Sequence, residues 1–184
     1  MKLGVMVSLP LGGKSTYCEF IKKNDYVIVC PDKIRVDMFG IDYVQNGKDE
    51  GTVWWNVKNT IKTLLLDNKD VMLDACNITR RGRKDFRKIA EKYGAEFEIH
   101  WMKTSLKECL SRQKNANRNQ PVVLPEVIRS MYERFQEPTD VEGTIISVPL
   151  TFEKNSRIFC SCEEEFLEDH LGYCTHCGRK VGLF

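Results

Sequence analysis

The sequence predicts an α/β fold, in which a five-stranded parallel sheet is flanked by helices and followed by a small cysteine-rich module. Two patterns predict it. Short apolar runs alternate with helical patterns over the first 150 residues, and the first run leads directly into a glycine-rich loop and a helix. A chain of 184 residues is long enough for one full-sized core and a small appendage. We therefore expect one domain over 1–150 and a second module over 157–184.

The five strands are expected where the apolar runs are short and rich in β-branched or aromatic residues. Several of these runs are apolar almost throughout, which is typical of strands covered on both faces. The expected strands are 3–7, 26–30, 71–74, 97–101 and 144–148.

Helices are expected between these strands. The segment 14–23 follows the glycine-rich loop, and 52–68 carries apolar residues at helical spacing. Thr79 is expected to cap a further helix, which Gly94 ends.

Composition limits the possible partners. The chain has 28 basic and 26 acidic residues, for a net charge of +2. This balance excludes general electrostatic attraction as the main driving force for nucleic-acid binding, so a nucleic acid would be held locally. No apolar stretch approaches the roughly 20 residues that span a bilayer, and the apolar start is too short for a signal peptide. We expect a cytoplasmic protein that does not bind membranes.

The glycine-rich loop predicts a nucleotide-binding site. Gly12 and Gly13 allow backbone amides to point at a phosphate, and Lys14 neutralises the β- and γ-phosphates. Ser15 is the expected Mg²⁺ ligand, and Thr16 continues the motif into a helix whose positive end faces the anion. The chain has Ser8 where the P-loop pattern begins with glycine. The alternative is a glycine turn before a capped helix.

A carboxylate and an arginine follow the second expected strand. Asp32 and Arg35 are three residues apart and would share one face of a helix. Ligands collect at the carboxyl ends of parallel strands, so Asp32 is placed to take a proton from an attacking hydroxyl, and Arg35 to hold an acceptor's phosphate. The alternative is a helix N-cap beside a solvated arginine.

The third expected strand ends in Asp74, followed by Asn77. A carboxylate at this edge can hold Mg²⁺ directly or through water, and burying it without a partner would be costly. Asp74 is therefore expected to hold Mg²⁺ and to contribute to substrate binding. Asn77 either helps to hold substrate or shapes the turn.

Two helices flank an arginine-containing segment. Ser105 and Glu108 have the spacing of a capping box, and Pro125 suits the first turn of the next helix. Between them, Arg112 and Arg118 are placed to act as a lid that stabilises the charge of a transferred phosphoryl group. The alternative is a solvated loop between helices.

These motifs in this order resemble the kinase domain of bacteriophage-type polynucleotide 5′-hydroxyl kinases, over residues 1–150. The motifs are GGKST, D-x-x-R after the second strand, LDACN, and R-x-x-x-x-x-R before PVVLPEVIRSMYERF. The resemblance implies that Lys14 and Ser15 serve ATP and Mg²⁺, that Asp32 is the general base, and that Arg35 holds the acceptor's phosphate. It also implies that Arg112 and Arg118 clamp the donor phosphates. The chain has no D-x-D-x-T motif for a phosphatase domain.

The eight cysteines form two groups. Four are scattered among apolar neighbours and are expected in the core: Cys18, Cys30, Cys76 and Cys109. The other four form a C-x-C pair and a C-x-x-C-G pair, a spacing that resembles a zinc ribbon and predicts a structural Zn²⁺ site: Cys160, Cys162, Cys174 and Cys177. The alternatives are free thiols, or a histidine that replaces one cysteine. The module is expected to contact a protein, nucleic acid or the kinase domain itself.

The leading hypothesis is an ATP-dependent kinase that phosphorylates 5′-hydroxyl ends of DNA or RNA, in the host cytoplasm if a phage encodes it. A second hypothesis keeps the chemistry but changes the acceptor to a hydroxymethylated base in phage DNA, or to a small nucleoside or nucleotide. A third is a zinc-ribbon binding module whose ATP site only switches its conformation.

Overall fold

The structure is a computed structural model that describes residues 1–22, 25–40, 47–115 and 123–149. The chain divides into two units, Met1–Val148 and Pro149–Phe184, and the first unit contains all of the described helices and strands. Arg118 and the four C-terminal cysteines lie outside the described residues.

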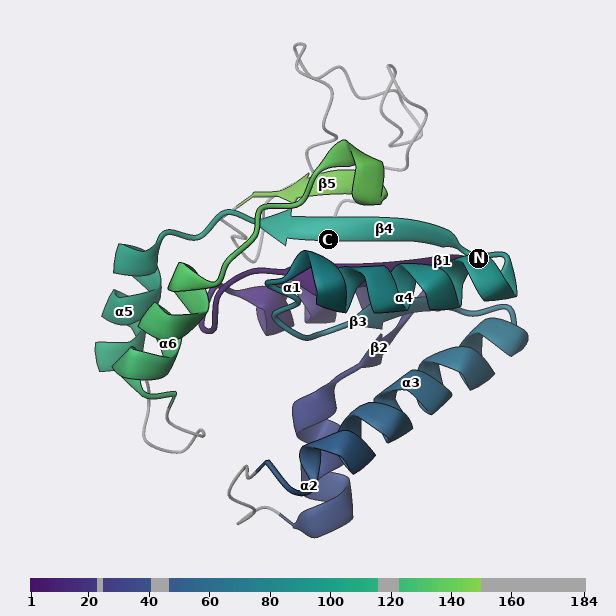
Figure 1. Ribbon diagram of the computed structural model, residues 1–184, viewed down its shortest axis with the longest axis horizontal. Helices are drawn as coiled ribbons and strands as arrows, with labels where there is room; N and C mark the ends of the chain where they lie inside the picture. The colour runs from purple at the N-terminus through teal and green to yellow at the C-terminus, as the bar shows by residue number, and fades with distance from the viewer. Residues whose placement is uncertain (23–24, 41–46, 116–122, 150–184) are drawn as a thin grey trace, which may run out of the picture. The chain divides into compact units, whose positions relative to one another are not determined.

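The centre of the first unit is a sheet of five parallel strands in the order β2-β3-β1-β4-β5 (Figure 1). The predicted five-stranded parallel sheet is therefore confirmed. The strands are β1 (Lys2–Val7), β2 (Tyr26–Val29), β3 (Asp70–Leu73), β4 (Glu96–Met102) and β5 (Thr144–Val148). β1 is central, so the loop that follows it emerges in the middle of the sheet's carboxyl edge.

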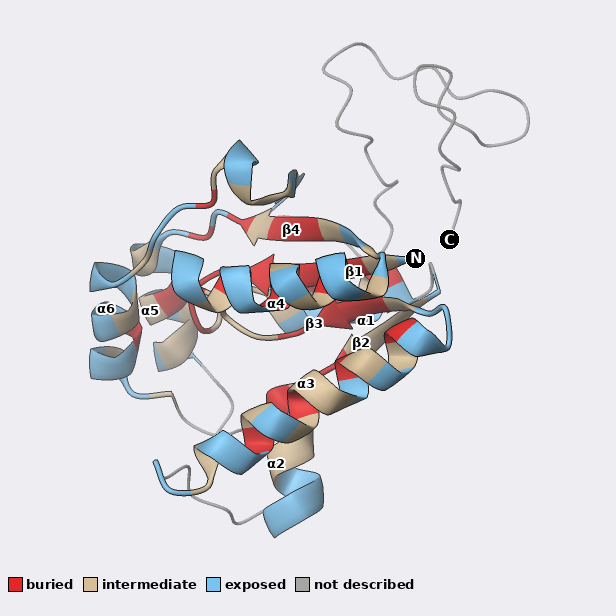
Figure 2. Cartoon of the chain, turned by 45° about the vertical axis from the view of Figure 1, so that its right-hand side comes forward, coloured by how far each residue is buried: buried red, intermediate tan, exposed pale blue. Residues whose placement is uncertain are grey.

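Helices cover both faces of this sheet. They are α1 (Lys14–Ile21), α2 (Pro31–Phe39), α3 (Glu50–Leu66), α4 (Arg80–Tyr93), α5 (Leu106–Lys114) and α6 (Pro125–Glu133), with a 3-10 helix η2 (Asp140–Glu142) before β5. Alternate residues of β1 determine the faces, because successive side chains of a strand point to opposite sides. Leu3, Val5 and Val7 join the core cluster that contains buried residues of α3 and α4, and Figure 2 colours the buried residues of these elements red.

The opposite face of the sheet contacts α1 through a buried polar network. The Tyr17 hydroxyl lies 2.7 Å from Nδ1 of His100, and Nε2 of that ring lies 3.2 Å from Glu98. The Tyr26 hydroxyl donates to the Glu98 carboxylate at 2.7 Å, and the Lys2 ammonium group forms an ion pair with the same carboxylate at 2.7 Å. Burial alone would raise the pKa of Glu98, but its hydrogen bonds to His100, Lys2 and Tyr26 lower it to about 2.

The helix ends agree with most of the sequence signals. The Thr79 side chain accepts from the Gly82 amide, and Gly94 ends α4 in the left-handed conformation. The capping box expected at α5 is only half formed. Ser105 accepts from the Glu108 amide, but the Glu108 carboxylate pairs with Arg112 instead of reaching back.

Among the residues that the structure describes, no helix is both long enough and apolar enough to cross a bilayer.

Candidate active site

The loop after β1 is a tight turn in which two residues adopt left-handed backbone angles and one glycine packs closely against its neighbours. Gly13 has φ 100° and Leu11 has φ 60°, so both lie in the left-handed region. A Cβ at Gly12 would lie 1.9 Å from the Ser8 hydroxyl oxygen, so the backbone packs too closely for a side chain there. α1 starts directly after this turn, at Lys14, and directs its positive end at the space the loop encloses.

Neighbouring elements hold the loop in place. The Ser8 amide donates to the Cys76 carbonyl at 3.2 Å, which ties the start of the loop to the turn after β3. The Thr104 hydroxyl donates to the Gly12 carbonyl at 2.7 Å, and Arg112 of α5 donates to the Leu11 carbonyl at 3.1 Å. These contacts fix the loop's carbonyls, so its geometry is preorganised before any ligand binds.

Lys14 turns back over the loop. Its Nζ donates to the Leu9 carbonyl at 3.1 Å, so the ammonium group lies across the turn that the two glycines form. A cation in this position can neutralise an anion seated on the loop amides.

Asp74 follows β3 and lies beside the start of α1. Its amide donates to the Val29 carbonyl at 2.9 Å, and the residue is only 8% exposed. Burial raises the pKa of its carboxyl, whereas the hydrogen bond with Ser15 and the charge of Lys14 act in the opposite direction. A buried carboxylate beside a serine hydroxyl is a donor set that suits Mg²⁺, because the cation would offset the cost of burying the charge. The two residues therefore fit the ion that the sequence predicts.

Asp32 and Arg35 lie on α2, which Pro31 starts and Gly40 ends. The Arg35 guanidinium donates to Asp32 at 2.5 Å. On its other side it donates twice to Glu50 of α3, at 2.9 and 2.7 Å. The Asp32 side chain is 85% exposed, whereas that of Arg35 is 11% exposed. The hydrogen bond to Glu50 is the main reason that the pKa of Arg35 is raised, so the arginine is a fixed cation beside an accessible carboxylate.

Glu50 is the residue that sequence reasoning missed. It lies fifteen residues after Arg35 and belongs to a different helix, so no local spacing connects the two. The only signal is an acidic residue at the start of the next helix, which is also an ordinary feature of helix N-termini.

Two carboxylates thus lie at the same edge of the sheet. After burial, the negative charge of Asp32 is one of the causes that raise the pKa of Asp74, so the two groups are within electrostatic reach of each other. One is exposed and the other buried, which suits them to different tasks.

The remaining predicted site residues differ in how far the structure places them. Asn77 has φ 42° and its amide nitrogen donates to the carbonyls of Met6 and Ala75, at 2.8 and 3.1 Å. It therefore shapes the turn after β3, which is one of the two roles that the sequence left open for it. Arg112 lies beside the glycine-rich loop after β1, which we call the phosphate loop from here on, and also pairs with Glu108 at 3.1 Å.

The cysteines of the first unit only partly follow the prediction of core residues. Cys18 and Cys109 are buried as expected, whereas Cys30 and Cys76 are half-buried, because they lie at strand ends on the carboxyl edge. Within the described residues, no group of three or more His, Cys, Asp or Glu side chains could hold a metal ion. The predicted zinc ligands lie outside those residues.

A cavity of about 390 Å³ lies beside the turn after β3. The turn residues 75–78 form one wall, and Trp54, Phe86 and Met131 supply apolar walls from α3, α4 and α6. Lys58 and Asp85 also line it, and a pocket with this lining can accept a flat apolar group beside the turn after β3.

Comparison with known families agrees with this geometry. A family described as an AAA domain matches residues 3–138. The chain belongs to this family. A family match over that range contains the loop after β1, the Asp32–Arg35 helix and the strand that ends at Asp74.

Solved structures share the fold. A chain of the Pnkp1/Rnl/Hen1 RNA repair complex is similar with a TM-score of 0.65 and 23% identity, over 72% of this chain and 43% of that one. A putative kinase from Chloroflexus aurantiacus has a TM-score of 0.61 and 14% identity, over 82% and 89% of the two chains. A gluconokinase from Sinorhizobium meliloti has a TM-score of 0.52 and 18% identity, over 81% and 85%.

The first unit of this AAA-domain protein is therefore a P-loop kinase-like α/β fold. The chain spans less than half the length of the repair-complex chain that it matches.

Proposed function

We propose that this protein is an ATP-dependent kinase that transfers the γ-phosphate of ATP to the 5′-hydroxyl end of DNA or RNA. The observation that carries the proposal is the accessible Asp32 carboxylate, held by an arginine that Glu50 fixes in place, at the sheet edge that also presents the phosphate loop. The fold shared with a chain of an RNA repair complex supports a polynucleotide acceptor.

In this proposal the loop and α1 bind the donor. The amides around Gly12 and Gly13 and the N-terminus of α1, with Thr16 in its first turn, hold the phosphates. Lys14 leaves the Leu9 carbonyl to contact the β- and γ-phosphates. Ser15 and Asp74 would hold Mg²⁺, which would neutralise charge on the β- and γ-phosphates. Arg112, with Arg118 outside the described residues, clamps the donor.

The acceptor binds on the α2 side. Asp32 takes the proton of the 5′-hydroxyl as its oxygen forms a bond to the γ-phosphorus, and the bond from that phosphorus to the β–γ bridging oxygen breaks, releasing ADP. Arg35 holds a phosphate of the acceptor strand, and Asp74 and Asn77 complete the acceptor side. Glu50 is assigned the task of fixing Arg35.

A small-molecule kinase is the second candidate. The fold is shared with a gluconokinase at similar coverage of both chains, and the cavity beside Trp54 can take a compact acceptor. Phosphorylation of hydroxymethylated bases within DNA would use the same residues on another hydroxyl.

The test is transfer of labelled γ-phosphate from ATP and Mg²⁺ to a panel of acceptors. The panel holds 5′-hydroxyl DNA and RNA oligonucleotides, hydroxymethyluracil DNA with blocked 5′ ends, free nucleosides and gluconate. Label at 5′ ends is the expected result. Label only on internal modified bases or on a small molecule would reject the proposed acceptor, and ATP binding with no labelled acceptor would favour an ATP-switched binding module.

We also propose a structural Zn²⁺ in the C-terminal module, on the spacing of its cysteines alone. The proposed ligands are Cys160, Cys162, Cys174 and Cys177. All four positions would be filled by protein, so the ion would stabilise a segment too small to fold on apolar burial. Elemental analysis of the purified chain is expected to give about one zinc per chain, and a C174S/C177S variant should lose it. Full zinc content in that variant would reject the site.

A further inference from the structure

The outer side of α4 concentrates positive charge that the proposed chemistry does not use. Seven of the chain's 28 basic residues lie in the fourteen residues of this helix, against two acidic ones. The whole chain has a net charge of only +2, so the surplus is local to α4.

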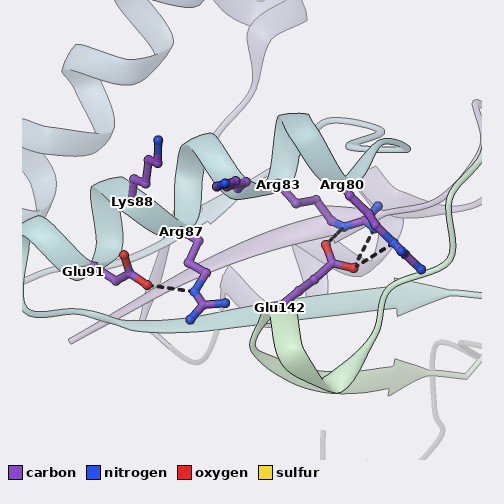
Figure 3. A pocket seen from close by; sticks show the side chains of 7 residues that line it. Arg80, Arg83, Arg87, Lys88, Glu91 and Glu142 are labelled. Carbon is purple, nitrogen blue, oxygen red and sulfur yellow. Dashed lines mark hydrogen bonds and ion pairs between the residues drawn. The ribbon is translucent and has the colours of Figure 1, made fainter.

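These side chains line a cavity of about 360 Å³ along the helix (Figure 3). We call its basic residues the α4 basic strip: Arg80, Arg83, Lys84, Arg87 and Lys88. They recur at intervals of three and four positions and therefore share one side of the helix. Residues four apart rise by about 6 Å along the axis, so the strip is a row of cations that extends over about two turns.

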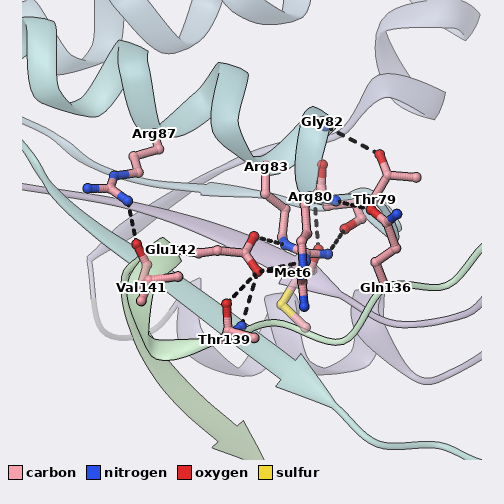
Figure 4. Close-up of polar contacts among 11 residues, drawn as sticks. Met6, Thr79, Arg80, Gly82, Arg83, Arg87, Gln136, Thr139, Val141 and Glu142 are labelled. Atoms are coloured by element: carbon pink, nitrogen blue, oxygen red, sulfur yellow. Dashed lines mark hydrogen bonds and ion pairs between the residues drawn. The ribbon is translucent and has the colours of Figure 1, made fainter.

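The two carboxylates of this cavity are already paired. Glu142 of η2 accepts from the buried Arg83 at 2.7 and 3.0 Å, and lies 3.8 Å from Arg80 (Figure 4). Glu91 accepts from Arg87 at 2.8 Å. Both carboxylates of the cavity are thus engaged by arginines of the strip and not by its lysines.

The side chains of Lys84 and Lys88 have no hydrogen bond or ion pair with any other residue that the structure describes. Both are exposed, and Figure 3 shows Lys88 pointing away from the Arg87–Glu91 pair. Their ammonium groups are therefore available to an external anion.

The charge pattern also opposes the stability of α4 itself. Arg80, Lys84 and Lys88 are like charges at successive intervals of four, which repel on a helix. The first turn contains arginines and no acidic residue, although the positive end of a helix favours anions. A sequence that breaks two local rules on one surface indicates a functional constraint, and a bound polyanion would relieve both repulsions.

We propose that the α4 basic strip binds the phosphate backbone of a single-stranded nucleic acid. This inference rests on the proposed polynucleotide acceptor and adds where that strand runs. α4 begins a few residues after Asp74, at the sheet edge that holds the candidate active site, and leads away from it. A strand with its 5′ end at Asp32 would be held by phosphates several nucleotides further on, which provides local binding despite the balanced charge of the chain.

The test measures binding directly and without catalysis. A fluorescein-labelled single-stranded 12-mer with a 5′-phosphate cannot accept a phosphoryl group, so its affinity does not depend on kinase activity. The parent chain, K84E/K88E and the control K22E/K69E are titrated over a range of salt by fluorescence anisotropy. The control makes the same charge change at exposed lysines outside α4, and circular dichroism confirms that each variant is folded.

We expect K84E/K88E to bind at least about tenfold more weakly at low salt, and its log–log salt slope to fall by about 1.4, as two lost phosphate contacts on a single strand require. K22E/K69E should bind like the parent chain. Equal weakening in both variants, or unchanged binding in K84E/K88E, overturns the inference.

Transfer to a 5′-hydroxyl oligonucleotide by the parent chain is measured alongside. Transfer by the parent chain, together with unchanged binding by K84E/K88E, would reject nucleic-acid binding by the α4 basic strip but not the proposed function. Loss of binding by K84E/K88E without any transfer by the parent chain would support nucleic-acid binding by the α4 basic strip but reject the proposed function.

Discussion

Single residues at the carboxyl edge have separable tasks. Lys14 is a half-exposed cation over the loop, Asp74 is buried against Ser15, and Asp32 is open to solvent. The sequence is enough to select these residues, since each lies in a short motif after a strand. It is not enough to find Glu50, because the pairing of that residue with Arg35 depends on how two helices meet.

Lys14→Ala tests the donor side. Loss of the cation removes charge stabilisation of the transferring group, so we expect transfer to fall by at least about 100-fold. The hydrogen bond from Lys14 to the Leu9 carbonyl is only partly buried, so the thermal midpoint should change little. Transfer rates and thermal unfolding are compared with Lys22→Ala, an exposed lysine directly after α1. A parental transfer rate in Lys14→Ala would exclude this lysine from phosphate binding.

Glu50→Gln tests whether Arg35 must be held. The substitution removes the charge that fixes the guanidinium from the α3 side, while Asp32 and the phosphate loop are untouched. We expect KM for the acceptor to rise by roughly tenfold, with a smaller change in kcat, because one charged hydrogen-bonding partner is lost. Steady-state kinetics of Glu50→Gln, and of Glu126→Gln at an exposed glutamate as a control, measure the separate changes in KM and kcat. A fall in kcat with unchanged KM would mean that Glu50 acts in the chemical step.

At the scale of elements, the strands were predictable and the helix contacts were not. Both ends of every expected strand lie within two residues of the ends of an observed strand. Apolar runs of this length are typical of buried strands in an α/β fold, which is why they could be located. The helix expected at 52–68 instead begins at Glu50. The sequence also contains no sign that Arg83 of α4 is fully buried against Glu142 of η2, since a basic helix usually presents its arginines to water.

Glu142→Gln tests that contact. Burial alone would raise the pKa of Glu142, but the hydrogen bonds and charge of Arg83 lower it, so this carboxyl is ionised at neutral pH. Neutralising the glutamate leaves Arg83 buried without a counter-charge, which costs about 3 kcal/mol. For a chain of this size the melting temperature should fall by about 6–12 °C. The control is Glu108→Gln, which breaks the exposed ion pair with Arg112. It should change the melting temperature by no more than about 3 °C. Equal changes in melting temperature in the two variants would show that the buried pair contributes no more to stability than the exposed one.

At the scale of the whole molecule, the buried network around Glu98 couples stability to acid pH. The pKa of this carboxyl is about 2 in the folded protein and about 4.5 when exposed. A lowered folded-state pKa contributes stability that is complete above pH 4.5 and is lost as the pH falls towards 2. From about pH 5 to about pH 3 the parent should lose about 2 kcal/mol more of its free energy of unfolding than Glu98→Gln does.

Urea unfolding at these two pH values measures the difference. Glu96→Gln, an exposed glutamate on the same strand, should keep the parental pH dependence. If Glu98→Gln has the same acid sensitivity as the parent, the network does not hold this carboxylate ionised.

The structure places an accessible carboxylate, Asp32, at the sheet edge that carries the glycine-rich loop, and we propose that it is the base. The rate of γ-phosphate transfer by Asp32→Asn tests this proposal most directly. A single-turnover assay with a 5′-hydroxyl oligonucleotide compares this variant with the parent and with Asp37→Asn, an exposed aspartate on the same helix. We predict that Asp32→Asn loses about 10²–10⁴-fold in rate and keeps its affinity for ATP, while Asp37→Asn behaves as the parent. Transfer by Asp32→Asn at the parental rate would contradict the assignment of Asp32 as the base.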